Sequence, residues 1–179
     1  VDPIDGTNNY VRGIRFWATS VTAVSDGEPV ATATYLPAED DIYASGPEST
    51  TRNDDPIAVS DRTDPQSCTI GLIGHWPASR TDSTTALVRN SVATFGDTRR
   101  FGCLQGVLAL VAAGSLDAAF MPTTPHPWDA LGGVRLIRQA GGRVTDVHGD
   151  RFTNGAAGLV VSNGHVHETA LDVVAEHVD

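Results

Sequence analysis

The sequence predicts a layered α/β fold (α+β layered) in which residues 1–179 form a single domain. Three observations support this prediction. The chain has 179 residues, of which 40% are hydrophobic, enough to bury a substantial core. Short strands joined by tight turns are expected over the first quarter of the chain. Strands and helices then alternate from residue 68 onward, which is typical of sheets covered by helices.

The first part of the chain predicts an antiparallel meander. Three strands are expected from its apolar runs, at residues 16–24, 29–37 and 41–45. An Asp-Gly pair lies at the centre of residues 25–28 and indicates a hairpin turn between the first two strands. Residues 46–65 are rich in Thr, Asp and Pro, so we expect a surface loop with one short strand near residues 57–60.

The second part of the chain predicts alternating strands and helices. The expected strands are residues 68–74, 99–101, 116–122, 143–146 and 159–162. The expected helices are residues 80–95, 104–114, 127–140 and 165–177. The first of these helices would place Leu87, Val88, Val92 and Phe95 on one face. The second is almost entirely apolar and should be buried, and it should end at Gly114.

Composition limits the partners and the compartment. The formal net charge is −10, and all 12 basic residues are arginine. A diffuse negative surface disfavours nucleic acids and anionic membranes as partners. The acidity suits a salt-rich cytoplasm such as that of a haloarchaeon, while a GC-rich genome would also favour arginine over lysine.

No run approaches the roughly 20 apolar residues of a membrane span. The two cysteines suggest reduced core thiols. We therefore expect a cytoplasmic protein.

The stretch VDPIDGTNNY at the start of the chain is dense in oxygen ligands. Gly6 permits a sharp turn there. The carboxylates of Asp2 and Asp5 and the carbonyl of Ile4 can then converge on one point, as a hard cation such as Mg²⁺ requires. The N–H groups of Gly6 and Thr7, at the start of a short helix, would suit a phosphate. The alternative from these residues alone is an ordinary Asx turn with an aspartate as helix cap.

A second stretch, HPWDALGGVRLIRQAGG, places Asp129 in the first turn of a helix with Pro127 near its start. The helix dipole alone favours an acid at this position. Ala130, Gly132 and Gly133 give the helix a small face that would let either a ligand or another element come close. By itself, this stretch leaves those alternatives open.

Together the two stretches resemble the signatures of the inositol monophosphatase family. Residues 2–10 match D-P-[IL]-D-G-T-x-N-[FY], and residues 128–142 match W-D-x-A-[GA]-G followed by a helix ending in A-G-G. Between them, RRFGCLQGVLALVAAGSLDAAF stands where the family has its R-S-x-G-[ST]-A-A helix. The resemblance covers essentially the whole chain.

The resemblance implies a sugar-phosphatase αβαβα sandwich that hydrolyses phosphate monoesters with Mg²⁺ as cofactor. In the family, two helices, a β-hairpin and a Glu ligand precede the first motif. This chain is therefore expected to be the C-terminal portion of a member, with those helices and the hairpin missing. A small sugar phosphate or inositol phosphate is the implied substrate, and a homodimer is the oligomer that the family suggests.

The resemblance also implies a role for each site residue. The implied metal ligands are Asp2, Ile4 (through its carbonyl), Asp5 and Asp129. The implied catalytic residues are Asp2, Asp5 and Thr7, whose hydroxyl would orient the attacking water. The implied phosphate-binding or substrate-binding residues are Gly6, Thr7 and Asp129.

Three departures from the family pattern bear on activity and substrate. The Glu ligand that precedes the first motif in the family is expected to be missing. The motif beside the sugar contains Cys103, Leu104 and Gln105, which are larger than the family's small residues. Pro122 stands where inositol-specific members place a Glu.

These departures leave several functions open. Inositol 1-monophosphate or 4-monophosphate is the first expected substrate, and fructose 1,6-bisphosphate is a competitor. We rank 3′-phosphoadenosine phosphate lower, because nothing in the sequence suggests an adenine pocket. A truncated, inactive folded module is the alternative of another class.

Several other residues could bind a ligand, but an ordinary structural role also explains each of them. His126 is expected to be a loop histidine rather than a substrate contact. Arg99 and Arg100 could face a phosphate or pair with surface acids. No metal site is expected at the histidines near the C-terminus, which are His165, His167 and His177.

Overall fold

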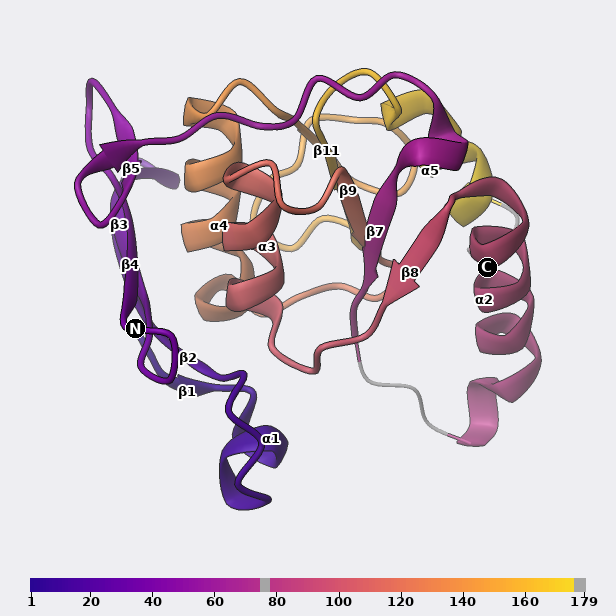
Figure 1. Cartoon of the computed structure of the whole chain (residues 1–179), viewed down its shortest axis with the longest axis horizontal. Coiled ribbons are helices and arrows are strands. Elements are labelled where there is room, and N and C mark those ends of the chain that lie inside the picture. Colours follow the sequence, from indigo (N-terminus) through magenta and orange to yellow (C-terminus); the bar gives the residue numbers. More distant parts are fainter. Residues whose placement is uncertain (75–77, 176–179) are drawn as a thin grey trace.

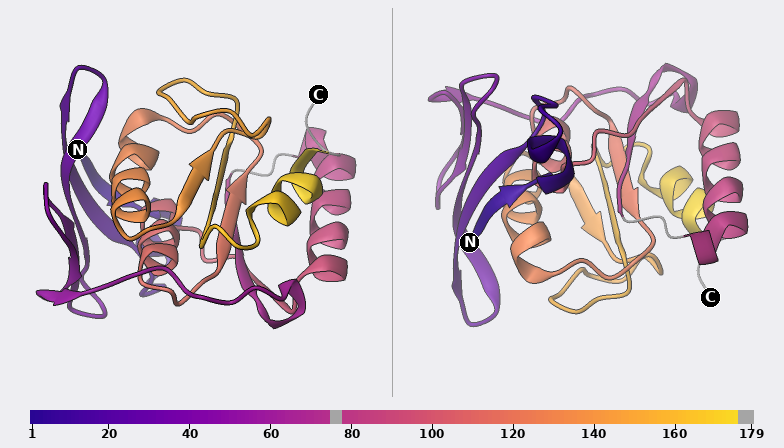
Figure 2. Two further views of the ribbon diagram at one scale, coloured as in Figure 1. Left: turned by 90° about the horizontal axis from the view of Figure 1, so that it is seen from above. Right: turned by 90° about the horizontal axis from the view of Figure 1, so that it is seen from below.

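The computed structural model describes residues 1–74 and 78–175, and these residues form four layers. Figure 1 shows them from left to right as a first sheet, a pair of helices, a second sheet and a second pair of helices. The views from above and below in Figure 2 show the same order of layers. The predicted layered α/β class is therefore confirmed. The described residues do not form the outer helical layer that would complete an αβαβα sandwich.

The first sheet is an antiparallel meander in which each strand pairs with the next in sequence. Its strands are β1 (Asp2–Asp5), β2 (Ala18–Ser25), β3 (Glu28–Leu36), β4 (Asp41–Ser45), β5 (Thr50–Arg52) and β6 (Asp55–Pro56). The predicted hairpin turn lies between β2 and β3, where Asp26 and Gly27 have positive φ angles of 52° and 81°. Both central residues of a type I′ turn need positive φ, which explains the Asp-Gly pair.

The short strand predicted near residues 57–60 is wrong. The sheet ends earlier in the chain with the β5–β6 hairpin, whose turn residues Asn53 and Asp54 have φ angles of 50° and 70°. The Ile57 N–H still donates to the Thr50 carbonyl of β5 at 3.1 Å, and the Val59 N–H then donates to the carbonyl of Ala140, 3.2 Å away. At Val59 a bond to the end of a distant helix thus replaces the expected strand pairing.

The second sheet has five strands in the order β10-β11-β9-β7-β8. The strands are β7 (Thr69–Leu72), β8 (Asp97–Arg99), β9 (Ala118–Met121), β10 (Arg143–Thr145) and β11 (Leu159–Ser162). β7 runs parallel to β8 and β9, and the other pairs are antiparallel. The four other predicted strands are confirmed, whereas β8 lies two residues earlier than the predicted residues 99–101 and shares only Arg99 with them.

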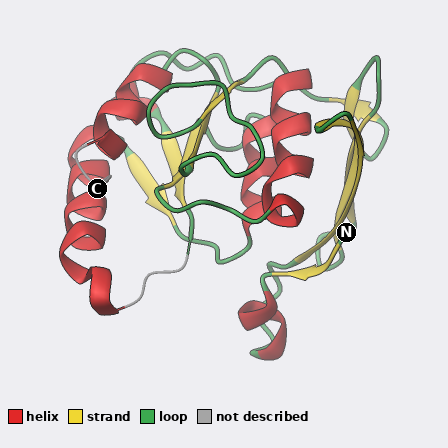
Figure 3. Ribbon diagram, turned by 180° about the vertical axis from the view of Figure 1, so that it is seen from behind, coloured by secondary structure: helices red, strands yellow, loops and turns green. Residues whose placement is uncertain are grey.

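The helices occupy the predicted segments. They are α1 (Thr7–Val11), α2 (Thr81–Thr94), α3 (Leu104–Ala112), α4 (Pro127–Gln139) and α5 (His167–Ala175), with 3₁₀ turns at Pro65–Ser67 and Ala78–Arg80. Figure 3 shows α3 and α4 side by side next to the first sheet, and α2 and α5 at the opposite end of the molecule. Pro127 lies at the start of α4, as predicted. His177, assigned to the last helix, lies outside the described residues.

The buried face of α2 differs from the prediction at one position. Leu87 and Phe95 are buried as expected, but Val92 is 60% exposed. Ser91 is buried in its place, and its hydroxyl donates to the Leu87 carbonyl at 2.7 Å. That internal bond satisfies the hydroxyl and lets a polar residue occupy the buried face.

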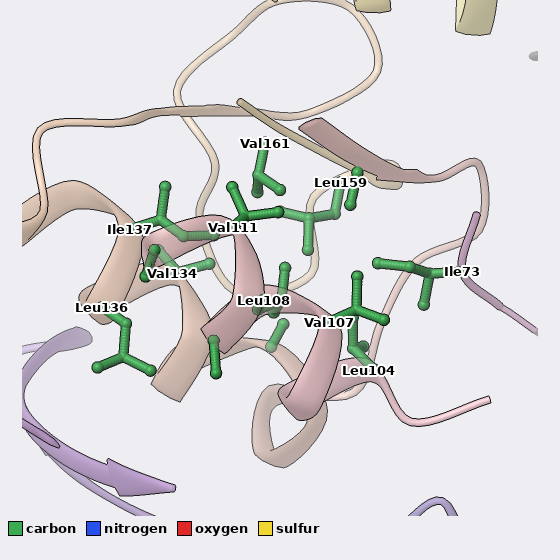
Figure 4. Close-up of a cluster of buried hydrophobic side chains, with 14 of the residues drawn as sticks. Ile73, Leu104, Val107, Leu108, Val111, Val134, Leu136, Ile137, Leu159 and Val161 are labelled. Carbon is green, nitrogen blue, oxygen red and sulfur yellow. The ribbon is translucent and has the colours of Figure 1, made fainter. Parts of the chain in front are cut away.

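The main hydrophobic core lies between the two sheets and is built around α3 and α4 (Figure 4). Labelled core side chains include Leu108, Val111, Val134, Ile137, Leu159 and Val161. Burying each such side chain stabilises the fold by about 1.5–3 kcal/mol. The prediction that α3 is buried is confirmed, since eight of its nine residues are buried.

The small residues of α4 allow close packing against neighbouring elements. A Cβ on Gly132 would lie 2.8 to 3.0 Å from hydroxyl oxygens of the first sheet, on Thr22, Thr32 and Ser20. A Cβ on Gly133 would lie 2.3 Å from the Cβ of Leu108 on α3. The sequence left open whether these small residues admit a ligand or another element. At Gly132 and Gly133 they admit neighbouring elements, namely the first sheet and α3.

The opposite face of the first sheet is exposed in this chain. Val21 on β2 and Ile42 on β4 are 50% and 48% exposed.

No helix in the described part of the chain combines the length and apolar character needed to cross a membrane.

Candidate active site

The first motif forms a strand, a left-handed turn and a short helix. β1 ends at Asp5, and Gly6 follows with a φ of 80° before α1 begins at Thr7. The Gly6 carbonyl accepts the N–H groups of Asn9 and Tyr10 at 2.8 and 3.0 Å. A Cβ on Gly6 would lie 3.0 Å from the Cβ of Cys103. Both the backbone conformation and the packing therefore require glycine at this turn.

Internal hydrogen bonds hold the oxygen atoms of the motif in place. Asp2 is 8% exposed, and its Oδ1 accepts the Ile4 N–H at 3.2 Å. The Thr7 hydroxyl donates to the Ile4 carbonyl at 2.9 Å. The Asx-type turn considered from the sequence is therefore present. It leaves the second Asp2 oxygen and a lone pair of the Ile4 carbonyl available for other contacts.

Asp5 contacts the start of α3. Its Oδ2 accepts the backbone N–H of Gln105 at 2.5 Å and the Cys103 thiol at 3.2 Å. The first N–H groups of a helix lack partners within the helix, so Asp5 caps α3 from a distant part of the chain. Burial raises the pKa of Asp5, the Gln105 N–H opposes this shift, and the charge of Asp2 adds to it.

Asp129 lies in the first turn of α4 and faces both aspartates of the first motif. Its pKa is raised to about 6, chiefly by burial, then by the charge of Asp5 and by a side-chain hydrogen bond with Asp2. The structure thus brings together the three predicted acidic ligands from two distant segments of the chain. Burial and nearby like charges both disfavour the ionised carboxylate, which explains the direction of the shift.

The donor types in this cluster suit Mg²⁺. Asp2 and Asp5 both raise the pKa of Asp129, and a divalent cation between the carboxylates would relieve their repulsion. Carboxylate and carbonyl oxygens are the protein ligands that this ion takes. Within residues 1–74 and 78–175, no group of three or more His, Cys, Asp or Glu side chains already has the spacing of a metal site. The chemistry fits the ion, with one oxygen of Asp5 turned toward α3.

A cavity of about 480 Å³ opens beside the carboxylates. Its lining includes Asp5, Asn8, Arg100, Thr123, His126 and Asp129. Asp2, Ile4, Gly6 and Thr7 are not among the lining residues. The size falls within the roughly 300–1,000 Å³ of small-molecule pockets.

Two residues that were not predicted as site residues, His126 and Arg100, line this cavity. His126 lines it and stacks on Trp128, with ring centroids 4.6 Å apart and planes 11° from parallel. Arg100 also lines it, and its guanidinium donates to the Gly74 carbonyl at 3.4 Å. Arg99 instead forms an ion pair with Asp97. His126 lies in the loop immediately before α4, as predicted, and from there it lines the cavity.

Two further side chains were not assigned roles from the sequence. Asn9 is 8% exposed, and its amide donates to the carbonyls of Phe16 and Phe101 at 2.7 and 2.6 Å. These bonds join α1 to the segment before α3. Gln105 is fully buried and bonds to both α4 and Asp5. A lone glutamine in an apolar helix was the available signal.

The departures from the family pattern lie at this cavity or beside it. Cys103 and Leu104 line it, and both are buried. Met121 and Thr123 line it on either side of Pro122 in the chain, and Pro122 is not among the lining residues. Sulfur and hydrocarbon therefore form part of the wall where the family has small residues.

Comparison with known proteins identifies relatives along the entire chain. The model of the "Inositol monophosphatase family" matches residues 1–179. An inositol-1-monophosphatase of Mesorhizobium japonicum is 35% identical over 175 residues, which cover 96% of this chain and 64% of that protein. A fructose-1,6-bisphosphatase/inositol-1-monophosphatase of Thermotoga maritima is 30% identical over 180 residues, which cover 100% of this chain and 68% of that protein.

A solved structure shares both the fold and the sequence pattern. The extragenic suppressor protein suhB of Bartonella henselae superposes with a TM-score of 0.92 at 30% identity, over 99% of this chain and 69% of that one. This chain thus spans about two thirds of the length of the relatives it matches. With the family model matching from the first residue to the last, the chain belongs to the inositol monophosphatase family.

Proposed function

We propose that this protein hydrolyses phosphate monoesters with Mg²⁺, and that inositol monophosphate is its first substrate. The observation that carries the proposal is the meeting of Asp2, Asp5 and Asp129, of which Asp5 and Asp129 line the cavity. Burial, then the charge of Asp5 and contact with Asp2, raise the pKa of Asp129 to about 6. Membership of a phosphatase family supports the reaction class. The negative charge of the chain supports a small-molecule substrate over nucleic acid, and the expected compartment is the cytoplasm.

Four residues would hold the metal. Asp2, Asp5 and Asp129 would contribute carboxylate oxygens, and Ile4 would contribute its carbonyl. Bound Mg²⁺ supplies positive charge that lowers the pKa of the attacking water and neutralises the leaving ester oxygen. The polypeptide has to supply mainly position, because phosphoryl transfer needs alignment and charge more than covalent help.

Thr7 and the adjacent glycine would bind and orient the reactants. The hydrogen bond from Thr7 to the Ile4 carbonyl fixes the rotation of the hydroxyl. Its oxygen can then accept a hydrogen bond from the attacking water. The N–H groups of Gly6 and Thr7 stand at the start of α1 and would donate to the phosphate oxygens.

A second substrate is favoured by the wall of the cavity. Leu104 replaces a small residue beside the sugar, and Pro122 replaces the Glu of inositol-specific members. The Thermotoga maritima relative is named for both fructose-1,6-bisphosphatase and inositol-1-monophosphatase. Fructose 1,6-bisphosphate is therefore the second candidate.

The test is phosphate release from inositol 1-phosphate, fructose 1,6-bisphosphate and 3′-phosphoadenosine phosphate, each with and without Mg²⁺. Asp5→Asn is the matched variant, because asparagine keeps an oxygen for the Gln105 N–H but loses the charge. Turnover that needs Mg²⁺ and falls in the variant would support the proposal, and the preferred ester would name the substrate. No turnover on any ester would favour a folded module without activity.

A further inference from the structure

Gln105 is a fully buried polar residue inside an apolar helix. It is the second residue of α3, its exposed fraction is 0%, and the other residues of that helix are Leu, Gly, Val and Ala. A buried amide without partners destabilises a fold. The position therefore requires specific hydrogen bonds, and these bonds indicate what the residue does.

The Gln105 side chain makes two hydrogen bonds to the backbone of α4. Its Nε2 donates to the Trp128 carbonyl at 2.8 Å. Its Oε1 accepts the Gly133 N–H at 3.1 Å. Trp128 immediately precedes Asp129, and Gly133 lies one helical turn after it. The amide therefore holds the backbone on both sides of Asp129.

The backbone of the same residue contacts the other predicted ligand. The Gln105 N–H donates to Oδ2 of Asp5 at 2.5 Å. One residue is thus bonded to the carboxylate of Asp5 and to the helical turn that carries Asp129. These two carboxylates line the same cavity.

Close packing of α3 on α4 makes this bridge short and rigid. A Cβ on Gly133 would lie 2.3 Å from the Cβ of Leu108, so the two helices approach without room for a side chain. Leu108 and Val134 are both fully buried at this contact layer. The Gln105 amide therefore connects two helices, α3 and α4, whose relative position is fixed by close packing.

We propose that Gln105 is a positioning residue, which sets the separation between Asp5 and Asp129 so that both carboxylates can hold one Mg²⁺ ion. This inference rests on the proposed function. Gln105 acts through the backbone of α4 and through its own N–H, and its side chain does not need to touch metal or substrate. Partners that orient metal ligands commonly change metal affinity by about 10- to 100-fold.

The test measures Mg²⁺ binding by isothermal titration calorimetry on the whole chain. Gln105→Met removes both amide bonds and keeps an unbranched side chain of similar size. Val111→Ala is the stability control, because it lies on the same helix, is fully buried and loses only apolar contacts. Gln105→Ala also removes both amide bonds and is too small to overpack the interface between α3 and α4. If Gln105→Met does not fold, the Mg²⁺ affinity of Gln105→Ala is compared with that of the unsubstituted chain instead.

We expect Gln105→Met to weaken Mg²⁺ binding by at least about tenfold, while Val111→Ala lowers the melting temperature and leaves Mg²⁺ binding unchanged. Phosphate release by Gln105→Met should then require more Mg²⁺ and recover at saturating Mg²⁺. Equal Mg²⁺ affinity in Gln105→Met and the unsubstituted chain would overturn the positioning role while leaving the proposed function intact. Absence of Mg²⁺ binding by the unsubstituted chain would overturn both.

Discussion

A Cβ on Gly6 would lie 3.0 Å from the Cβ of Cys103, so the turn of the first motif rests on the residue that precedes α3. This contact joins two segments that are far apart in the sequence. It brings Asp5 to the first N–H groups of α3, where Gln105 binds it at 2.5 Å. The shape of the candidate site therefore depends on an absent side chain at residue 6.

Gly6→Ala should destabilise the protein and reduce phosphate release. Its φ of 80° costs an L-residue about 1–2 kcal/mol, and the contact with Cys103 adds to that cost. Gly13→Ala is a matched control, since Gly13 has a φ of 73° with nothing within 4 Å of the added Cβ. Urea unfolding should show a larger loss for Gly6→Ala. Equal losses would mean that the contact with Cys103 does not constrain the turn.

His167 should make stability depend on pH. It is fully buried between the hydroxyls of Thr145 and Ser162, each 2.9 Å from a ring nitrogen. Burial, helped by the charge of Arg143, lowers its pKa from 6.5 to about 4. Below pH 6.5 the imidazole is protonated in the unfolded chain but stays neutral in the folded chain. The free energy of unfolding therefore falls as the pH drops toward 4. Below pH 4 both states are protonated, so this contribution no longer changes.

The measurement for His167 is urea unfolding at pH 7.5 and at pH 5.5. This one group should lower the free energy of unfolding by about 1 kcal/mol between those values. His167→Gln should lose that part of the pH dependence, whereas a change at the exposed His148 to Gln should keep it. The same pH dependence in both variants would rule out His167 as its source.

Both cysteines should be inert in the folded protein. Cys68 and Cys103 are 1% and 2% exposed. Burial raises the pKa of Cys68 to about 11 and raises that of Cys103 as well, with the nearby charge of Asp5 adding to the second shift. The thiolate is the reactive form, so a thiol reagent at pH 8 should label neither residue until denaturant is added. Rapid labelling of the native protein would contradict the burial of these side chains.

Salt should stabilise the fold. The formal net charge is −10, and screening weakens the repulsion among like charges on a compact protein. The melting temperature should therefore rise between low salt and molar KCl. Sucrose at matched osmolality is a useful control, because it leaves the charges unscreened. A melting temperature that does not change with KCl would count against the inference drawn from acidity.

Local signals accounted for much of the fold. β4 occupies the predicted residues 41–45, because a clear apolar alternation lies between turn residues. α4 begins at Pro127 and ends before Gly141, whose φ is 90°. The positions of Asp2 and Asp129 relative to these elements followed from the two motifs.

Long-range packing decided the features that the sequence did not reveal. Residues 57–60 have strand-like composition, but after Ile57, which donates to the Thr50 carbonyl of β5, the Val59 N–H donates to Ala140 at the end of α4. His126 reaches the cavity because Trp128 supports its ring, which depends on the path of the loop. The role of Gln105 requires α3 and α4 to touch, and no local pattern specifies which helices will be neighbours.

The most direct test of Mg²⁺-dependent hydrolysis compares phosphate release from inositol 1-phosphate by the unsubstituted chain, Asp129→Asn and Asp172→Asn. Asp172 is an exposed acid on α5 and controls for the loss of one charge. We predict release that requires Mg²⁺, falls at least about tenfold in Asp129→Asn and is unchanged in Asp172→Asn. Release that persists without Mg²⁺, or that Asp129→Asn leaves intact, would contradict the assignment of these carboxylates as the metal-binding centre of a phosphatase.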